Sequence, residues 1–216
     1  PKNPWDIDRW AGSSSSGSGV ATALGLCTGS LGSDTGGSIR FPSAACGLVG
    51  IKPTYGRVSR FGVLDLAQTL DHVGPMTRDV RDAALILAAI SGFDENDLTT
   101  ISAISPNFDD IENTNLDGVT IGYSENYSED GVDKEIVKAT RNVLKILKYH
   151  GATVRNIELD DIDSFLPAWK TICSAEALNA HSSFYPERES EYGLWFKGWL
   201  EHGSSVSSQE YIDASR

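Results

Sequence analysis

Residues 32–43 read GSDTGGSIRFPS, and this stretch is the most informative part of the chain. Gly36 and Gly37 stand directly before Ser38, and glycines allow the backbone N–H groups of such a loop to converge beside the hydroxyl. Converging amides are what an oxyanion hole requires, so Ser38 is a candidate nucleophile. A serine hydroxyl needs a proton acceptor, and the nearby serine-rich residues 12–18 supply only hydroxyls that could relay a proton. From these residues alone, the stretch fits either a nucleophile loop or a glycine turn with a capping serine.

The glycine-rich segments do not match the common phosphate-binding motifs. Residues 32–37 have the Walker spacing, but Ser38 follows where a lysine is required. Residues 17–22 begin like a dinucleotide fingerprint, but Thr22 stands where that motif has glycine or alanine. The four histidines lie too far apart in the sequence to predict a zinc site, and the G-x-S-x-G nucleophile elbow is missing. We therefore expect neither a metal nor an organic cofactor.

The composition is that of a globular protein. The chain has 216 residues, 40% of them hydrophobic and 22% charged, which fits one domain or a large piece of one. Its formal net charge of −12 argues against binding to nucleic acid or to anionic lipid. An acidic protein of this kind binds a small neutral or cationic partner more easily than an anionic one.

The sequence also predicts where the chain resides. It has no apolar run of the roughly 18 to 20 residues that a membrane helix needs, and its first ten residues do not resemble a signal peptide. We therefore expect a cytoplasmic protein that does not bind membranes. Cys27, Cys46 and Cys173 are odd in number and far apart, so we expect small buried side chains, with neither disulfides nor a zinc site.

Hydrophobic periodicity predicts several elements of secondary structure. Residues 20–27 are apolar enough for a short buried helix between two Gly/Ser loops, and residues 78–92 form one helical face. Thr77 is placed to cap the start of the second helix, and Gly92 is placed to end it.

A strand–helix–strand unit follows, with strands at 119–123 and 154–159 and a helix at 133–149 that Gly151 ends. Such a unit is usually parallel, so the expected class is α/β with a mixed or parallel sheet. Another helix begins near Ser164. The aromatic residues from Tyr192 to Trp199 are expected to pack in a core. We divide the chain into a serine-loop core at 1–92, a surface connection at 93–117, and the βαβ and helical part at 118–216.

Four stretches resemble the amidase signature family: GSSSSGS at 12–18, residues 32–43, CGLVGIKPTYGRVSR at 46–60, and LDHVGPMTR at 70–78. The resemblance runs from about residue 3 to about residue 210 and is densest between residues 12 and 78. It implies the family's α/β fold, a mixed and mostly parallel sheet flanked by helices, of which this chain would be the central part.

The resemblance also implies a catalytic apparatus. In this family a Ser–cis-Ser–Lys triad hydrolyses an amide through an acyl-enzyme ester. Ser38 matches the nucleophile, and the family's spacing places the bridging serine at Ser14. The oxyanion hole would consist of the backbone amides of Thr35, Gly36, Gly37 and Ser38. Asp34 and Arg40 match residues that brace this loop.

Two positions depart from the family pattern. Ser13 stands where the family usually has a glycine before the bridging serine. The family's catalytic lysine lies upstream of the serine loop, which places it before Pro1. Lys2 and Lys52 are the nearest lysines, but neither lies in the family's lysine motif.

Three functions are compatible with this pattern. The first is a stand-alone amidase acting on a small-molecule amide, for which a homodimer is one possible assembly. The second is the glutaminase component of an aspartyl/glutamyl-tRNA amidotransferase, which works with partner subunits. The third is an inactive, truncated amidase-like binding domain. His72 favours the first, because general amidases resemble its Leu-Asp-His form whereas the amidotransferases more often have Leu-Asp-Gln. Residues 171–178 also resemble general amidases.

Overall fold

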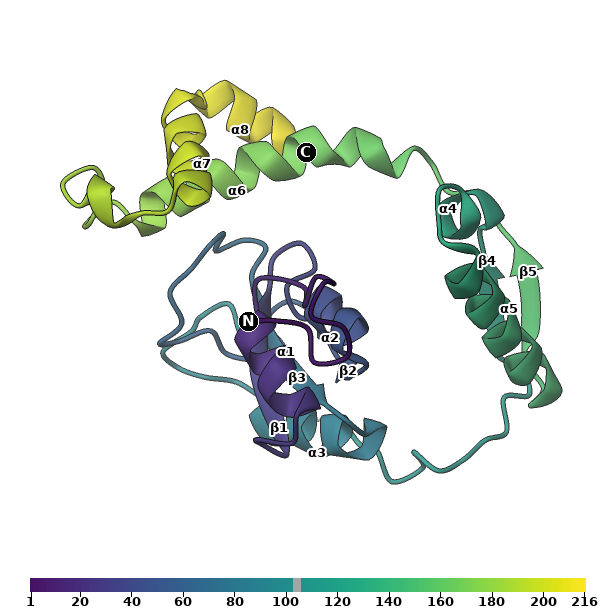
Figure 1. The fold of residues 1–216 in the computed structure, drawn as a ribbon. Helices are drawn as coiled ribbons and strands as arrows, with labels where there is room; N and C mark the ends of the chain where they lie inside the picture. The colour runs from purple at the N-terminus through teal and green to yellow at the C-terminus, as the bar shows by residue number, and fades with distance from the viewer. Residues whose placement is uncertain (103–105) are drawn as a thin grey trace. The chain divides into compact units, whose positions relative to one another are not determined.

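A computed structural model describes residues 1–102 and 106–216. The chain forms two compact units (Figure 1). Unit 1 combines Pro1–Phe108 with Pro167–Arg216, and unit 2 is Asp109–Leu166. Unit 1 is therefore discontinuous in the sequence. This division differs from the expected boundaries, because Pro167–Arg216 forms one compact unit with the serine-loop core.

A three-stranded antiparallel sheet lies at the centre of unit 1, in the order β1-β3-β2. β1 is Gly29–Asp34, β2 is Val49–Gly50 and β3 is His72–Thr77. In the register of β1 with β3, Asp34 lies opposite His72. A Cβ on Gly74 would lie only 2.0 Å from the carbonyl oxygen of Ile51. Glycine at this position therefore allows the backbone at Ile51 to approach β3 closely. Both β1 and β2 run antiparallel to β3, and two further strands, described below, pair in parallel, so the described strands have the mixed α/β class that was expected.

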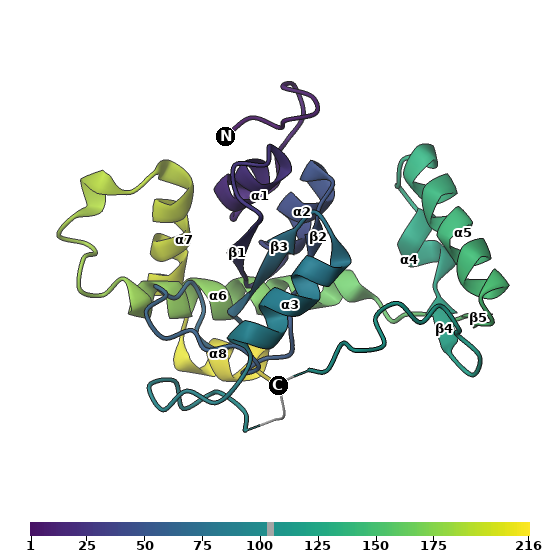
Figure 2. The ribbon, with the colours of Figure 1, turned by 90° about the horizontal axis from the view of Figure 1, so that it is seen from below.

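Helices cover both faces of this sheet (Figure 2). Met76 and Val73 point to opposite faces because side chains alternate along β3. α1 (Ser16–Ala23) and α2 (Arg40–Cys46) pack on each other near Met76, where a Cβ on Gly19 would contact both Met76 and Pro42. On the other face, Val73 packs with Leu87 of α3 (Val80–Ile90).

Two helix boundaries differ from the sequence prediction. α1 begins within the serine run at Ser16 and ends at Ala23, because its small residues fit closely against α2. α3 is capped by Asp79, whose side chain accepts the Arg81 N–H at 2.7 Å, and not by Thr77. Thr77 is the last residue of β3, so its backbone belongs to the sheet and the helix begins after it.

Three helices complete unit 1: α6 (Leu166–Ala180), α7 (Leu194–Ser205) and α8 (Ser208–Ala214). Short 3-10 turns precede α6 and α7, at Ile162–Phe165 and Glu189–Glu191. A Cβ on Gly203 would lie 2.2 Å from the Ser174 carbonyl oxygen, so α7 crosses α6 closely at this glycine. The aromatic stretch is only partly packed: Tyr192 and Phe196 stack on each other, whereas Trp195 is 91% exposed. Core packing was therefore the wrong expectation for Trp195.

Unit 2 has the predicted strand–helix–strand order. β4 (Thr120–Tyr123) pairs in parallel with β5 (Thr153–Asn156), and α5 (Lys134–Tyr149) connects them. A short helix, α4, spans Glu125–Glu129. Asp133 caps α5 by accepting the Glu135 N–H at 2.8 Å. Gly151 follows the helix with φ of +102°, a backbone conformation that favours glycine. The second strand is shorter than expected and ends at Asn156.

The connection predicted at 93–117 includes residues 103–105, which lie outside the described residues. Its remaining residues contain no helix or strand, only an isolated bridge between Asp94 and Asp97. Among the helices of the described ranges, none is both long enough and apolar enough to cross a membrane. Cys46 and Cys173 are buried and Cys27 is half-buried, each with a free thiol.

Candidate functional site

The loop between β1 and α2 is organised by the side chain of Asp34. This carboxylate is completely buried and accepts the backbone N–H groups of Gly37 at 2.6 Å and Ile39 at 3.2 Å. The Arg40 guanidinium donates to it twice, through Nε and Nη2, both at 2.9 Å. Burial by itself would raise the pKa of Asp34, but the hydrogen bonds from Arg40 and from the two amides hold it below its ordinary value. Asp34 is therefore ionised and serves as the fixed centre around which the loop turns.

The serine run lies against this loop. The Ser15 N–H donates to the Ser38 carbonyl at 3.3 Å, and the Ser15 hydroxyl bonds to the Ser33 backbone N–H and C=O at 3.2 and 3.3 Å. Ser14 is exposed, Ser38 is half-buried, and the peptide bond between Ser13 and Ser14 is cis. The structure thus brings together the two segments that carry the sequence-predicted serines. Ser15, which makes the connection, was not distinguished from its serine neighbours by sequence.

One predicted oxyanion-hole donor is engaged elsewhere. The Gly37 N–H points at the Asp34 carboxylate, so it is not free to bind a substrate oxygen, and its assignment to the oxyanion hole is corrected. Gly37 instead has a conformational role, since its φ is +133° and a Cβ there would lie 2.3 Å from the Phe41 ring. The amides of Thr35, Gly36 and Ser38 remain candidates.

Thr35 is held by two residues that sequence reasoning did not identify. Its hydroxyl donates to the Asp71 carboxylate, which also accepts the backbone N–H groups of Leu66 and Ala67. Its carbonyl accepts the indole N–H of Trp169 on α6 at 3.1 Å. The contact with Trp169 joins residues 134 positions apart, so no local sequence pattern could have indicated it.

His72 contacts the same loop from β3. Its Nδ1 lies 2.6 Å from the Leu70 carbonyl and 3.2 Å from the Asp34 carbonyl. Because both partners are acceptors, we assign the proton to Nδ1. Burial and the nearby charge of Lys52 lower the pKa of His72 below its ordinary value of 6.5. His72 is therefore neutral at pH 7.

Neither lysine considered in the sequence is joined to the serines. Lys52 is half-buried, and its ammonium group donates to the Pro53 carbonyl at 2.8 Å. Burial lowers the pKa of Lys52, while the Asp34 carboxylate opposes that shift. Lys2 is exposed. In the described ranges, no hydrogen bond links either lysine to Ser14 or Ser38.

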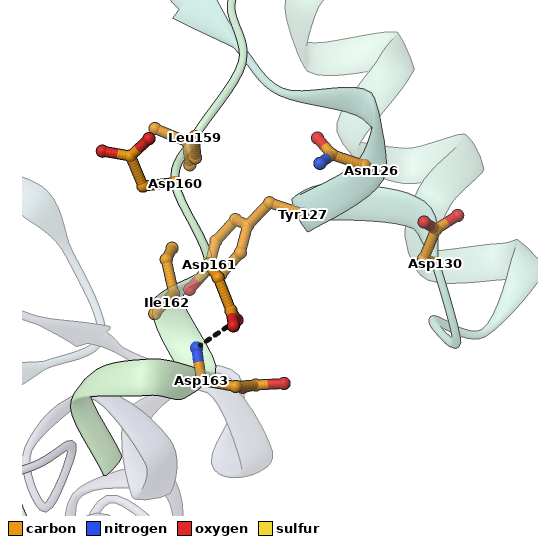
Figure 3. A pocket seen from close by; sticks show the side chains of 8 residues that line it. All are labelled: Asn126, Tyr127, Asp130, Leu159, Asp160, Asp161, Ile162 and Asp163. Atoms are coloured by element: carbon orange, nitrogen blue, oxygen red, sulfur yellow. Dashed lines mark hydrogen bonds between the residues drawn. The ribbon is translucent and has the colours of Figure 1, made fainter.

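A separate cavity of about 370 Å³ lies within unit 2 (Figure 3). It is lined by Asn126, Tyr127, Asp130, Leu159, Asp160, Asp161, Ile162 and Asp163. Asp161 accepts the Asp163 N–H at 3.1 Å, the bond drawn in Figure 3. None of the predicted site residues lines this cavity. Across residues 1–102 and 106–216, no group of three or more His, Cys, Asp and Glu side chains is arranged to hold a metal ion.

Comparisons with known proteins agree with the resemblance seen in the sequence. The sequence model of the family described as Amidase matches residues 1–214. The A subunit of glutamyl-tRNA(Gln) amidotransferase from Clostridium botulinum (strain Okra / Type B1) is 46% identical over 183 residues, 85% of this chain and 38% of that protein. The putative amidase AmiD of Mycobacterium bovis is 42% identical over 212 residues, 98% of this chain and 44% of that protein.

A solved structure also matches this chain. The chain is similar to the A subunit of glutamyl-tRNA(Gln) amidotransferase from Thermotoga maritima, with a TM-score of 0.81 and 34% identity. The match covers 98% of this chain and 46% of that one. This chain therefore spans less than half the length of the relatives it matches.

Proposed function

Because the chain belongs to the amidase family, we propose that it carries the nucleophile of an enzyme that hydrolyses small-molecule carboxamides. The observation that carries this proposal is the Asp34-centred loop. Its hydrogen bonds fix the backbone on both sides of Ser38, and the bond from Ser15 brings the serine run alongside.

In the proposed reaction the Ser38 Oγ attacks the carbonyl carbon of the amide. Its proton passes through the Ser14 hydroxyl toward a lysine that these 216 residues do not supply. The backbone amides of Thr35, Gly36 and Ser38 stabilise the negative charge that develops on the carbonyl oxygen. The C–N bond then breaks as the departing nitrogen takes up the proton, and ammonia or an amine leaves. Water hydrolyses the ester on Ser38 to release the carboxylate.

The test is labelling with a fluorophosphonate probe together with ammonia release from simple carboxamides, both in the full-length protein. Ser38→Ala should abolish labelling and lower turnover by at least about 10³-fold, as loss of a nucleophile does. Ser128→Ala is a matched control, because Ser128 lies on α4 in unit 2. Labelling that persists in Ser38→Ala would refute the assignment. A wild-type protein that neither labels nor turns over would favour the inactive binding domain.

The second candidate is the glutaminase component of an aminoacyl-tRNA amidotransferase. It is supported by the 46% identity to the C. botulinum amidotransferase protein, which exceeds the 42% identity to AmiD. His72 and the longer match to AmiD favour the stand-alone amidase. Ammonia release from glutamine, measured with and without amidotransferase partner subunits, separates the two, because only the amidotransferase component should depend on those partners.

A further inference from the structure

We propose that Trp169 and His72 are positioning residues that set the direction of two consecutive backbone amides, Gly36 N–H and Thr35 N–H. This inference rests on the proposed function, in which those amides face the substrate oxygen. Neither side chain needs to touch the substrate, because each acts through a carbonyl of the loop.

The argument begins with the peptide between Thr35 and Gly36. In a trans peptide the C=O and the following N–H point in opposite directions. In the described part of the chain only the Ser13–Ser14 and Tyr185–Pro186 bonds are cis, so this one is trans. Trp169 Nε1 donates to the Thr35 carbonyl at 3.1 Å. The Gly36 N–H must therefore point away from the indole.

The preceding peptide repeats this arrangement. His72 Nδ1 faces the Asp34 carbonyl at 3.2 Å, so the Thr35 N–H points away from the imidazole. The Thr35 side chain is fixed by its bond to Asp71, the residue next to His72. Two adjacent peptides are thus held through their carbonyl oxygens. These bonds orient the two N–H groups but do not occupy them.

The indole is itself held firmly. A Cβ on Gly36 would lie 2.7 Å from the Trp169 ring, so the ring lies directly on the Gly36 backbone. Trp199 packs edge-on against Trp169 with centroids 5.6 Å apart. Further along α6, the Glu176 carboxylate accepts the Thr69 N–H at 2.9 Å and the Thr69 hydroxyl at 2.7 Å. α6 therefore contacts both the nucleophile loop and the segment that leads into β3.

The test is Trp169→Phe in the full-length protein, because phenylalanine keeps an aromatic ring but lacks the N–H donor. Trp195→Phe is the matched control, because it makes the same substitution on α7 at a side chain that is 91% exposed. We expect Trp169→Phe to lower kcat about ten- to a hundredfold, less than the loss of an oxyanion donor. KM should change by less than about threefold, because the ground-state amide gains little from these donors.

A second measurement is independent of activity. With ¹⁵N-glycine labelling, the Gly36 amide resonance can be assigned by its absence in Gly36→Ala. Its ¹⁵N shift responds to hydrogen bonding of the preceding Thr35 carbonyl much more than to ring currents, so we expect that shift to change in Trp169→Phe but not in Trp195→Phe. An unchanged Gly36 resonance, or equal kinetic losses in both variants, would overturn the inference. If the wild type is inactive, the proposed function fails, whereas the Gly36 resonance still decides whether Trp169 orients this peptide.

Discussion

Asp34 and Arg40 are joined by two parallel hydrogen bonds, Nε to Oδ2 and Nη2 to Oδ1, each 2.9 Å long. The carboxylate is completely buried, whereas the arginine side chain is 53% exposed. The pair closes the turn that carries Ser38, so the planar guanidinium provides both charge and geometry.

Arg40→Lys should therefore destabilise the protein although it keeps the positive charge. A lysine cannot make the paired bonds, and a hydrogen bond to a charged group contributes about 1.5–3 kcal/mol. Urea denaturation of the two proteins measures this difference. Arg9→Lys is the matched control, because Arg9 and Asp6 form an exposed pair at 3.6 Å that should contribute less than about 0.5 kcal/mol. Equal midpoints for wild type and Arg40→Lys would contradict the role given to the pair.

The same carboxylate predicts how stability depends on pH in acid. The pKa of Asp34 in the folded protein lies below its ordinary value of 3.8. The unfolded chain therefore takes up a proton first as the pH falls, and the stabilisation present above pH 3.8 is lost as the pH falls through the folded value. Asp34→Asn lacks this titration, so its free energy of unfolding should change less over that range. Parallel curves for the two proteins would show that Asp34 is not the responsible group.

How much the sequence could predict depends on how local the determinants are. The α5 helix was predicted nearly to the residue, because its apolar period, the Asp133 cap and Gly151 lie within its own segment. The capping residue of α3 was misassigned, since nothing local shows that Thr77 belongs to a strand. β1 has no strand-forming composition and becomes a strand only by pairing with β3.

The candidate site follows the same rule. The family resemblance carried by residues 32–43 indicated the loop and its brace, and the structure shows the bonds between Asp34 and Arg40. The engagement of Gly37 by Asp34 was not predictable, because a glycine amide can point either to a substrate or to a neighbouring carboxylate. Trp169 contacts the loop from 134 positions away, and that distance excludes prediction from spacing.

His72 should be replaceable by a residue that keeps the donor. An asparagine amide can place N–H near the position of Nδ1, so we expect His72→Asn to retain most activity and His72→Phe to lose it mainly in kcat. The pH dependence provides a second test. Since the folded pKa of His72 lies below 6.5, its contribution to stability is present above pH 6.5 and is lost as the pH falls through the folded value. Both variants should lack this loss. Equal kcat in His72→Asn and His72→Phe would argue against a positioning role.

The thiols should differ sharply in reactivity. Burial, together with the nearby carboxylates of Asp71 and Glu176, raises the pKa of Cys173 to about 12, and burial raises the pKa of Cys46. Only the thiolate reacts with iodoacetamide, so both should resist alkylation in the native protein at pH 8. Cys27 is half-buried and should react first. Peptide mass spectrometry before and after denaturation measures this order, and early modification of Cys173 would contradict the buried position of α6.

The discontinuity of unit 1 has a consequence for synthesis on the ribosome. The bond between Asp34 and Arg40 spans six residues and can form as soon as that turn emerges. The bond from Trp169 to Thr35 must wait for 134 further residues, on the order of ten seconds at ordinary rates of translation. During that interval the nascent loop can form its bonds between Asp34 and Arg40, but it lacks the bond from Trp169. The geometry around Ser38 is therefore completed in two stages, and the second begins only after all of unit 2 has been translated.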